Sequence, residues 1–339
     1  METMRVVEIQ ESFGLDRLAV AERPRPEPAP GQVVLRMRAA SLNARDLMTV
    51  RGHYNPKQPL PLIPCSDGVG EVVGVGEGVD RVRPGDRVAA TFAQGWISGE
   101  PTWEMLRSTL GGPLDGTLAE FMALDAEAVV RVPEHLTDEE AATLPCAGLT
   151  AWSALVTHGQ IGRDDTVLVQ GTGGVSIFAL QFAKLLGARV IVSSSSEEKL
   201  ERARALGAWE TIHYASDADW GRTAKKLTGG AGVDHVVEVC GAQTLSQSSA
   251  ALRPGGQVSL IGVLSGTASE LSILPILMRQ LRIQGIFVGH RDGFEAMNRA
   301  VAEYRMRPTI SRVLPFEEVR TGLEEMAAGR HFGKICLRI

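Results

Sequence analysis

The spacing of hydrophobic positions changes near residue 137 and separates two kinds of predicted structure. Before residue 137, short segments alternate apolar and polar positions or are interrupted by glycine, which is typical of β-strands. The strands predicted there cover 33–41, 69–75 and 87–91. Four prolines in 23–31 favour an extended linker, because the residue before a proline is pushed away from helical geometry.

After residue 137 the pattern predicts alternating helices and strands. Thr137-Asp-Glu-Glu140 is a capping box that opens a helix, and Pro145 is predicted to end it. Short β-branched runs then alternate with stretches whose apolar residues recur at helical spacing. The predicted strands are 166–170, 189–193, 235–239, 257–262, 283–288 and a closing 334–339, with helices at 175–186 and 197–206. Such alternation predicts an α/β fold with a parallel, doubly wound sheet.

Composition and charge narrow the range of partners. The 339 residues exceed one typical domain, so two domains are expected. A net charge of −5 and a pI near 5.9 argue against nucleic acid or an anionic membrane as the main partner. No apolar run approaches the roughly 20 residues of a membrane span, and the first ten residues are acidic where a signal peptide has cations. The four cysteines form no CxxC pair, which favours a reducing, cytoplasmic setting.

A glycine-rich turn follows the strand 166–170 and precedes a helix. Glycine permits a tight turn and lets backbone N–H groups approach a pyrophosphate at the positive end of the helix. A glycine turn without a ligand is the alternative, but the position at the head of the strand–helix alternation favours a dinucleotide site. The residues of this turn are Gly171, Thr172, Gly173, Gly174, Val175 and Ser176, the last at a position where the fingerprint has Gly or Ala.

The residues after the second strand of this region indicate which dinucleotide binds. The run 193–196 is all serine, whereas a site that prefers NAD usually places Asp or Glu there. The hydroxyls of Ser194 and Ser195 and the ammonium of Lys199 could bind a 2′-phosphate, so NADPH is the predicted cofactor. Alternatively, Ser194 or Ser195 caps the next helix within a capping box and Lys199 is merely solvated. Both interpretations can hold together.

Five motifs together resemble the medium-chain dehydrogenase/reductase superfamily in order and spacing, over almost the whole chain. They are Val82-x-Pro84-Gly85-Asp86-Arg87-Val88, Pro145 to Trp152, Gly171 to Val175, Ala205-Leu206-Gly207-Ala208 and Gly333-Lys334-Ile335. The resemblance implies a GroES-like, β-rich catalytic domain split between residues 1–146 and 289–339. It also implies a Rossmann NADP-binding domain at 147–288, inserted between the two parts.

Zinc-dependent members of this superfamily hold a catalytic zinc with a Cys, a His in a Gly-His-Glu motif, and a later Cys or Asp. Here the first two positions read Asn43 and Ser66, and only Cys146 matches. The four-cysteine loop of a structural zinc is also missing. A catalytic zinc needs about three protein ligands, so no metal is predicted. An improvised site of Cys65, Asp67 and Cys146 is an alternative without the expected His, and otherwise Cys146 is a small buried side chain.

The segment Asn43-x-Arg45-Asp46 resembles the zinc-free branch that contains quinone oxidoreductases and enone reductases. This resemblance implies that Asn43 and Asp46 line the nicotinamide end of the cleft, and Tyr54 could donate a hydrogen bond to a substrate oxygen. A structural role is equally open. Asn43 is a good N-cap, and Asp46 three residues later stabilises the start of a helix that ends before Gly52.

The resemblance also implies cofactor contacts outside the glycine turn. Tyr214 and Lys199 together resemble a pair that grips the 2′-phosphate, and Lys334 is a further candidate. His290 departs from the small residue expected at its position. The remaining implied contacts, with the nicotinamide, the ribose and the carboxamide, are Thr150, Val239, Cys240, Gly241, Ile261, Gly262, Val263, Phe287 and Val288.

The predicted function is NADPH-dependent, zinc-independent hydride transfer to a quinone or an α,β-unsaturated carbonyl. A conjugated acceptor delocalises the incoming charge onto oxygen, so it needs no metal. One alternative is a metal-free alcohol dehydrogenase or carbonyl reductase, with His53 or Asp46 in proton transfer. Another is a crystallin-like or regulatory protein that binds NADPH without turnover. A homodimer is expected, because the resemblance makes 283–288 an apolar sheet edge that needs cover.

Overall fold

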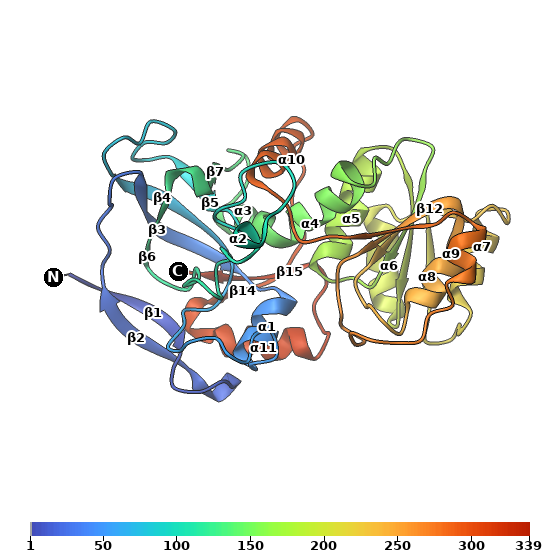
Figure 1. The fold of residues 1–339 in the computed structure, drawn as a ribbon, viewed down its shortest axis with the longest axis horizontal. Coiled ribbons are helices and arrows are strands. Elements are labelled where there is room, and N and C mark those ends of the chain that lie inside the picture. The colour runs from blue at the N-terminus through green and yellow to red at the C-terminus, as the bar shows by residue number, and fades with distance from the viewer. Residues whose placement is uncertain (1) are drawn as a thin grey trace. The chain divides into compact units, whose positions relative to one another are not determined.

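The computed structural model describes residues 2–339, which form two compact units (Figure 1). The first unit joins the residues up to Leu149 with Gly289–Ile339, and the second is Thr150–Val288. The boundary between them therefore lies at Leu149, where the sequence predicted residue 146. Within residues 2–339, no helix combines the length and the apolar character that a membrane crossing requires.

The first unit is built on a seven-stranded sheet. Its strand order is β14-β15-β3-β4-β5-β7, with β6 pairing to β3, and a separate antiparallel pair is formed by β1 and β2. The C-terminal strand pairs antiparallel with β3, so that Cys336 lies opposite Ser41. The strands are β1 (Thr3–Ile9), β2 (Leu18–Pro24), β3 (Gln32–Ser41), β4 (Asp67–Val75), β5 (Arg87–Ala90), β6 (Phe121–Asp125), β7 (Val129–Arg131), β14 (Ile310–Pro315) and β15 (Lys334–Arg338).

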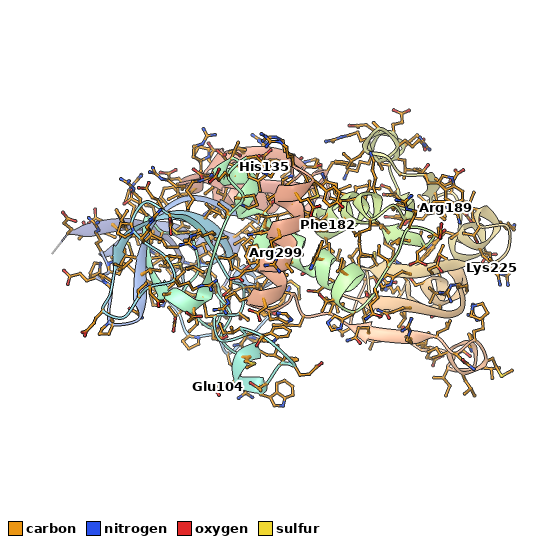
Figure 2. The ribbon with its side chains drawn as sticks, turned by 90° about the horizontal axis from the view of Figure 1, so that it is seen from above. Glu104, His135, Phe182, Arg189, Lys225 and Arg299 are labelled. Carbon is orange, nitrogen blue, oxygen red and sulfur yellow. The ribbon has the colours of Figure 1, made fainter. Side chains whose placement is uncertain are left out.

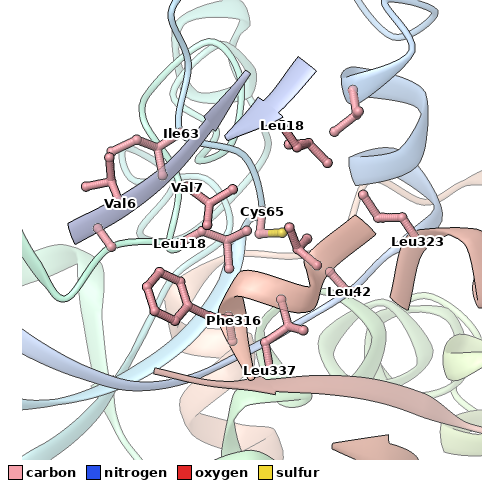
Figure 3. Packing of buried hydrophobic residues seen from close by; sticks show 14 of the residues in the cluster. Val6, Val7, Leu18, Leu42, Ile63, Cys65, Leu118, Phe316, Leu323 and Leu337 are labelled. Carbon is pink, nitrogen blue, oxygen red and sulfur yellow. The ribbon is translucent and has the colours of Figure 1, made fainter. Parts of the chain in front are cut away.

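These strands agree closely with the predicted ones, and the tight turn between β4 and β5 holds Gly85 at a φ of 92°. The start of the predicted linker 23–31 instead belongs to β2, which runs to Pro24. Figure 3 shows a hydrophobic core of this unit, a buried cluster that includes Cys65, Leu118, Phe316 and Leu337. The helices of this unit are α1 (Ala44–Val50), α2 (Trp103–Leu106), α3 (Asp138–Ala142), α10 (Arg291–Glu303) and α11 (Val319–Ala327).

The capping box at Thr137 is confirmed, and the helix that it opens, α3, ends at Ala142, before Pro145. Thr137 and Glu140 exchange the two expected hydrogen bonds at the start of α3. Pro145 then lies in the first turn of a π-helical segment, Leu144–Gly148, which continues into α4 (Leu149–Trp152) and a second π-helical segment. Proline is tolerated there because the first N–H groups of a helix have no intrahelical acceptor.

The second unit is a doubly wound α/β domain with a six-stranded parallel sheet. The order is β10-β9-β8-β11-β12-β13, so the winding reverses between β8 and β11. The strands are β8 (Thr166–Gln170), β9 (Arg189–Ser194), β10 (Glu210–His213), β11 (Val233–Glu238), β12 (Leu252–Leu260) and β13 (Arg282–Gly285). The helices are α5 (Gly174–Leu185), α6 (Glu197–Leu206), α7 (Trp220–Leu227), α8 (Leu245–Ala251) and α9 (Leu274–Met278).

Helix α5 packs against β8 and β9, and its phenylalanines are buried; Figure 2 labels Phe182. Phe178 and Phe182 stack with ring centroids 5.7 Å apart, and Trp152 meets Phe182 edge-on at 5.4 Å. The predicted strand 283–288 is shorter in the structure, because β13 ends at Gly285. Val288 has a φ of 48°, which lies outside strand geometry.

Candidate functional site

The carboxyl end of β8 forms a turn with the geometry of a pyrophosphate site. Gly171 has a φ of 70°, and a Cβ placed on it would meet no other atom within 4 Å, so the turn is open on that side. No side chain caps α5 at its N-cap residue Gly173, which leaves the N–H groups of its first turn for a ligand. Ser176 donates its hydroxyl proton to the Gln170 carbonyl oxygen at 2.7 Å, so its polar atom is satisfied within the close helix–strand packing. This turn fits a dinucleotide.

The tip of β9 brings together several of the predicted 2′-phosphate residues. Ser195 is exposed there, whereas Ser194 is buried and its hydroxyl oxygen accepts a hydrogen bond from the Ser196 N–H at 3.3 Å. Tyr214 follows β10, the neighbouring strand, and its N–H donates to the Ser194 carbonyl at 3.1 Å. The Tyr214 side chain is exposed. One edge of the sheet therefore carries a hydroxyl, a phenol and no carboxylate from residues 193–196.

The helix after β9 is capped by Ser196, and neither Ser194 nor Ser195 has that role. The Ser196 hydroxyl oxygen accepts a hydrogen bond from the Lys199 N–H at 3.4 Å. Burial lowers the pKa of Lys199 below its usual range, and the nearby Arg202 guanidinium lowers it further. Helix α6 thus carries the basic side chains Lys199 and Arg202 after the serine run, together with Glu197 and Glu198 in its first turn.

The remaining implied cofactor residues follow the next strands of the same sheet. Val239, Cys240 and Gly241 follow β11, and the turn after β12 is tied to β11 because the Ile261 N–H donates to the Glu238 carbonyl at 2.9 Å. Burial raises the pKa of the Cys240 thiol to about 11, so the thiol is protonated at neutral pH. The others are Gly262 and Val263 after β12, Phe287 and Val288 after β13, and Thr150 in α4.

In the first unit, Asn43 and Asp46 meet at the start of α1. Asp46 accepts a hydrogen bond from the Asn43 N–H at 2.8 Å, as the predicted cap requires. The Asn43 side chain has a partner that the sequence did not indicate. Its Oδ1 accepts a hydrogen bond from the Lys334 ammonium at 2.6 Å, and the same ammonium donates to the Leu42 carbonyl oxygen at 2.6 Å. Lys334, a candidate for the 2′-phosphate, is thus a buried cation of the first unit.

Two buried carboxyl groups balance two buried cations in this cluster. The Lys334 ammonium lies 3.8 Å from Asp67 Oδ2, and the Arg45 guanidinium lies 3.7 Å from Asp46 Oδ1. Burial raises the pKa of Asp46 to about 6, with Arg45 opposing the rise and Asp67 adding to it. Burial also raises the pKa of Asp67, and the Lys334 ammonium opposes that shift. The Asp46 carboxyl is therefore a weaker acid than an exposed aspartic acid.

Arg45 connects α1 to the segment around residue 110. Its guanidinium donates to the carbonyl oxygens of Leu110 at 2.6 Å and Gly112 at 2.9 Å. It also lies 4.8 Å from the ring centroid of Tyr54 and 5.0 Å from that of Phe92. Tyr54 is 41% exposed, so its phenol can meet a molecule from solvent. The Arg45 guanidinium thus packs against the ring of Tyr54, the predicted substrate-binding tyrosine.

The residues at the zinc-ligand positions do not fit a catalytic zinc ion. Asn43 directs its oxygen at an ammonium, which would repel a divalent cation, and Ser66 donates its hydroxyl proton to Asp67 at 3.0 Å. Of the three ligand positions, Cys146 alone offers a zinc ligand, and a catalytic zinc needs about three. Within residues 2–339, no three His, Cys, Asp or Glu side chains are grouped to hold a metal, so Cys65, Asp67 and Cys146 do not form the improvised site.

Comparisons with known proteins match both units to dehydrogenases. Residues 29–134 match the alcohol dehydrogenase GroES-like domain, and residues 174–303 match the zinc-binding dehydrogenase family. A zinc-type alcohol dehydrogenase-like protein of Schizosaccharomyces pombe is 41% identical, over 99% of each chain. An acryloyl-coenzyme A reductase of Metallosphaera sedula is 31% identical, over 94% of this chain and 95% of that one.

Solved structures give the same picture. A putative alcohol dehydrogenase from Sinorhizobium meliloti has a TM-score of 0.92 and 41% identity, over 100% of this chain and 99% of that one. An NAD-dependent alcohol dehydrogenase has a TM-score of 0.91 and 36% identity, over 99% and 100%. A mycobacterial protein in complex with NADPH has a TM-score of 0.83 and 27% identity, over 99% and 100%.

Proposed function

Because the chain belongs to the medium-chain dehydrogenase/reductase superfamily of nicotinamide-dependent oxidoreductases, we propose that it reduces quinones or α,β-unsaturated carbonyls with NADPH and without zinc. The observation that carries this proposal is the contact between Lys334 and Asn43. A buried ammonium bonds the side chain at the first zinc-ligand position, and Ser66 stands at the second.

A conjugated acceptor suits a site without a metal. The nicotinamide supplies a hydride, and the charge that arrives on the acceptor must be stabilised on an oxygen atom. In a quinone or an enone that charge is delocalised onto oxygen by conjugation, so a hydrogen-bond donor is sufficient help. The exposed phenol of Tyr54 is the proposed donor, and the reductase of acryloyl-coenzyme A among the relatives acts on a conjugated thioester.

NADPH is proposed over NADH on the basis of the second unit. The run 193–196 offers no carboxylate, Lys199 and Arg202 bring positive charge, and Tyr214 adds an exposed phenol next to Ser194. A 2′-phosphate carries nearly two negative charges, so a strand end with donors and with no carboxylate at 193–196 favours it. The first carboxylates, Glu197 and Glu198, follow in the first turn of α6. The mycobacterial neighbour that binds NADPH supports the same choice.

A metal-free alcohol dehydrogenase is the second candidate. Alcohol dehydrogenases are prominent among the similar structures, one of them NAD-dependent. Burial raises the pKa of Asp46 to about 6, and a carboxyl group with a raised pKa is the proposed proton-transfer group for this reaction. An NADPH-binding protein without turnover is the third candidate.

One screen separates the three candidates. Purified protein, dialysed against a chelator, is tested for NADPH oxidation with quinones, enones and aldehydes, and for NADP⁺ reduction with secondary alcohols. The proposal expects turnover of conjugated acceptors and little or none of saturated ones. Turnover of alcohols and aldehydes alone favours the second candidate, and NADPH binding without any turnover favours the third.

We also propose that the protein is a homodimer formed through the edge of the second unit's sheet. Strand β13 ends the strand order, so one side of it has no neighbouring strand. Beside it in sequence, α9 and its N-cap residue Ile273 present apolar side chains to solvent: Ile273 is 74% exposed, Leu274 60%, Leu277 72% and Met278 72%. A two-fold axis at this edge would pair β13 with its copy and cover those side chains.

A further inference from the structure

Glu238 is a fully buried carboxylate at the end of β11, and all of its hydrogen-bonding partners are neutral. Its Oε1 accepts from the Cys240 N–H and the Gly241 N–H, each at 2.9 Å, and from the Thr244 hydroxyl at 2.8 Å. Its Oε2 accepts from the Gln170 side-chain amide at 2.7 Å and from the Ser248 hydroxyl at 2.5 Å. Burying a carboxylate is costly, and five donors offset that cost here.

Three of the five partners of Glu238, Gln170, Cys240 and Gly241, lie in or directly beside the turns that carry the implied cofactor contacts. Gln170 is the last residue of β8, directly before Gly171, so its bond ties β11 to the turn of the glycine motif. Cys240 and Gly241 form the turn after β11 itself. One side chain therefore joins the carboxyl ends of two adjacent parallel strands, on either side of the point where the winding of the sheet reverses.

The bonds to Glu238 also fix the loop after β12. A peptide group is planar and trans, so an N–H that points at Glu238 turns the carbonyl of the same peptide away from it. The Cys240 carbonyl, turned away in this manner, accepts from the Ser265 N–H at 2.7 Å and the Ser265 hydroxyl at 2.9 Å. Ser265 lies just beyond Ile261–Val263. The packing is close, because a Cβ on Gly262 would stand 2.0 Å from the Val239 carbonyl oxygen.

Ligands of doubly wound sheets bind at the carboxyl ends of the strands, at the point where the winding reverses. We propose that Glu238 is a positioning residue for cofactor binding: its carboxylate holds the turns after β8 and β11, and through Cys240 the loop after β12, in the arrangement that binds the nicotinamide cofactor. The proposal rests on the assignment of the cofactor to this edge. Because Glu238 acts on the turns, its loss should weaken NADPH and NADH by the same factor.

Two substitutions at one carboxylate oxygen provide a matched test. Gln170→Met and Ser248→Ala each remove one donor from Glu238 Oε2, and each also breaks the bond that the Gln170 amide donates to the Ser248 hydroxyl at 2.7 Å. They differ in position, because Gln170 leads into the glycine turn and Ser248 lies within α8. In fluorescence titrations with NADPH and with NADH, Gln170→Met should raise both dissociation constants about tenfold, and Ser248→Ala should change them less than about twofold. Turnover at saturating cofactor should stay within about threefold for both variants.

Variants of Glu238 itself complete the experiment. Glu238→Ala should raise both dissociation constants by about tenfold or more. Glu238→Gln should stay within about threefold, because its amide oxygen can serve Cys240 and Gly241 while the Gln170 amide turns to accept from its NH₂ group. If Glu238→Ala does not fold, the Gln170 and Ser248 pair decides the question alone.

Three results would overturn the inference. Equal changes in cofactor affinity for Gln170→Met and Ser248→Ala would show that the bond from Gln170 to Glu238 does not position the glycine turn. Lowered melting temperatures with unchanged affinities would leave Glu238 a purely structural residue. A change in the NADPH-to-NADH ratio would mean that Glu238 acts at the 2′-phosphate. The preference of the wild-type protein for NADPH, which tests the proposed function, is read from the same titrations and can fail without affecting this comparison.

Discussion

The Lys334 ammonium lies 2.6 Å from Asn43 Oδ1, and this contact fixes the orientation of the Asn43 amide. An ammonium only donates hydrogen bonds, so it requires the amide oxygen and turns the NH₂ group away. The same ammonium lies 3.8 Å from Asp67 Oδ2, and its charge works against the rise in the pKa of that carboxyl. Asn43, Lys334 and Asp67 therefore form one connected buried network, drawn from β15, β4 and the start of α1.

The purified protein should contain no stoichiometric zinc, because the network places a cation of its own beside Asn43. Metal analysis after purification without added zinc should give well below one zinc per chain, and turnover should survive dialysis against a chelator. About one zinc per chain, with activity lost to chelator and restored by zinc, would contradict this.

Lys334→Met should strongly destabilise the first unit. The substitution leaves Asp67 buried without its cation, and breaking a buried ion pair costs about 3–5 kcal/mol. The control is Arg338→Met on the same strand, where the guanidinium is 69% exposed and pairs with Glu139. An exposed pair contributes about 1 kcal/mol or less. Denaturant unfolding of both variants measures the difference, and equal losses would show that the buried network adds no special stability.

Lys199→Ala should weaken NADPH binding about tenfold and leave NADH binding almost unchanged, since only NADPH carries the 2′-phosphate. The matched control is Lys184→Ala. Lys184 lies in the last turn of α5, at the end of that helix away from Gly171, and donates to the Leu206 carbonyl. Fluorescence titration with both cofactors gives the four affinities. Equal weakening of NADPH and NADH by Lys199→Ala would leave the serine run without a role in cofactor choice.

Much of the second unit could be predicted from the sequence because its signals are local. A strand, a glycine turn and a helix follow each other within about twenty residues around Gly171, and the helix predicted at 197–206 has those bounds in the structure. The end of β13 could not be predicted, because the apolar run continues through Val288 while its backbone adopts a positive φ. Local hydrophobicity does not encode that change of conformation.

The buried cluster around Asn43 could be predicted only in part from the sequence, because some of its contacts are not local. Asn43 and Asp46 are three residues apart, so their capping relationship is local and was predicted. The partner of the Asn43 side chain is 291 residues away, on a strand whose pattern showed only apolar character. Gly333-Lys334-Ile335 did mark Lys334 as a motif residue, but nothing in the pattern indicates that an ammonium at the start of a buried strand turns toward α1.

Leu277→Glu should convert the proposed dimer to a monomer. Leu277 is 72% exposed on α9, and a carboxylate there would be buried without a partner if this surface contacts its copy. Light scattering at micromolar concentration should give about twice the chain mass of 36.4 kDa for the wild type and the single mass for the variant. Trp103→Glu is the control, since Trp103 is 76% exposed in the first unit. A monomeric wild-type protein would contradict the proposed homodimer.

Asp46→Asn should remove a pH-dependent loss of stability. Burial raises the pKa of Asp46 from an unfolded value near 3.8 to about 6, so the folded state favours the protonated form. The stability that this provides is present below pH 4 and is lost as the pH rises to about 6, a change of at most about 3 kcal/mol. Asn cannot titrate and still accepts the Asn43 N–H. The stability of the variant relative to the wild type should therefore increase between pH 4 and pH 6, as denaturant unfolding at several pH values would show.

His235 should produce the opposite pH dependence in the second unit. It lies buried on β11 with Nε2 3.0 Å from the Ser259 hydroxyl, and burial lowers its pKa from 6.5 to about 4. In the unfolded chain His235 is protonated as the pH falls below about 6.5, whereas in the folded protein it stays neutral until about pH 4. The free energy of unfolding therefore decreases as the pH falls from 6.5 to 4. The loss is at most about 3 kcal/mol.

His235→Asn keeps a hydrogen-bonding group toward Ser259 but cannot be protonated. This variant should be less stable than the wild type at pH 7, because it packs less volume against Gly159, yet it should lose less stability between pH 6.5 and pH 4.5. If the free energies of unfolding of the two proteins change by the same amount across that pH range, His235 is not buried in the neutral form.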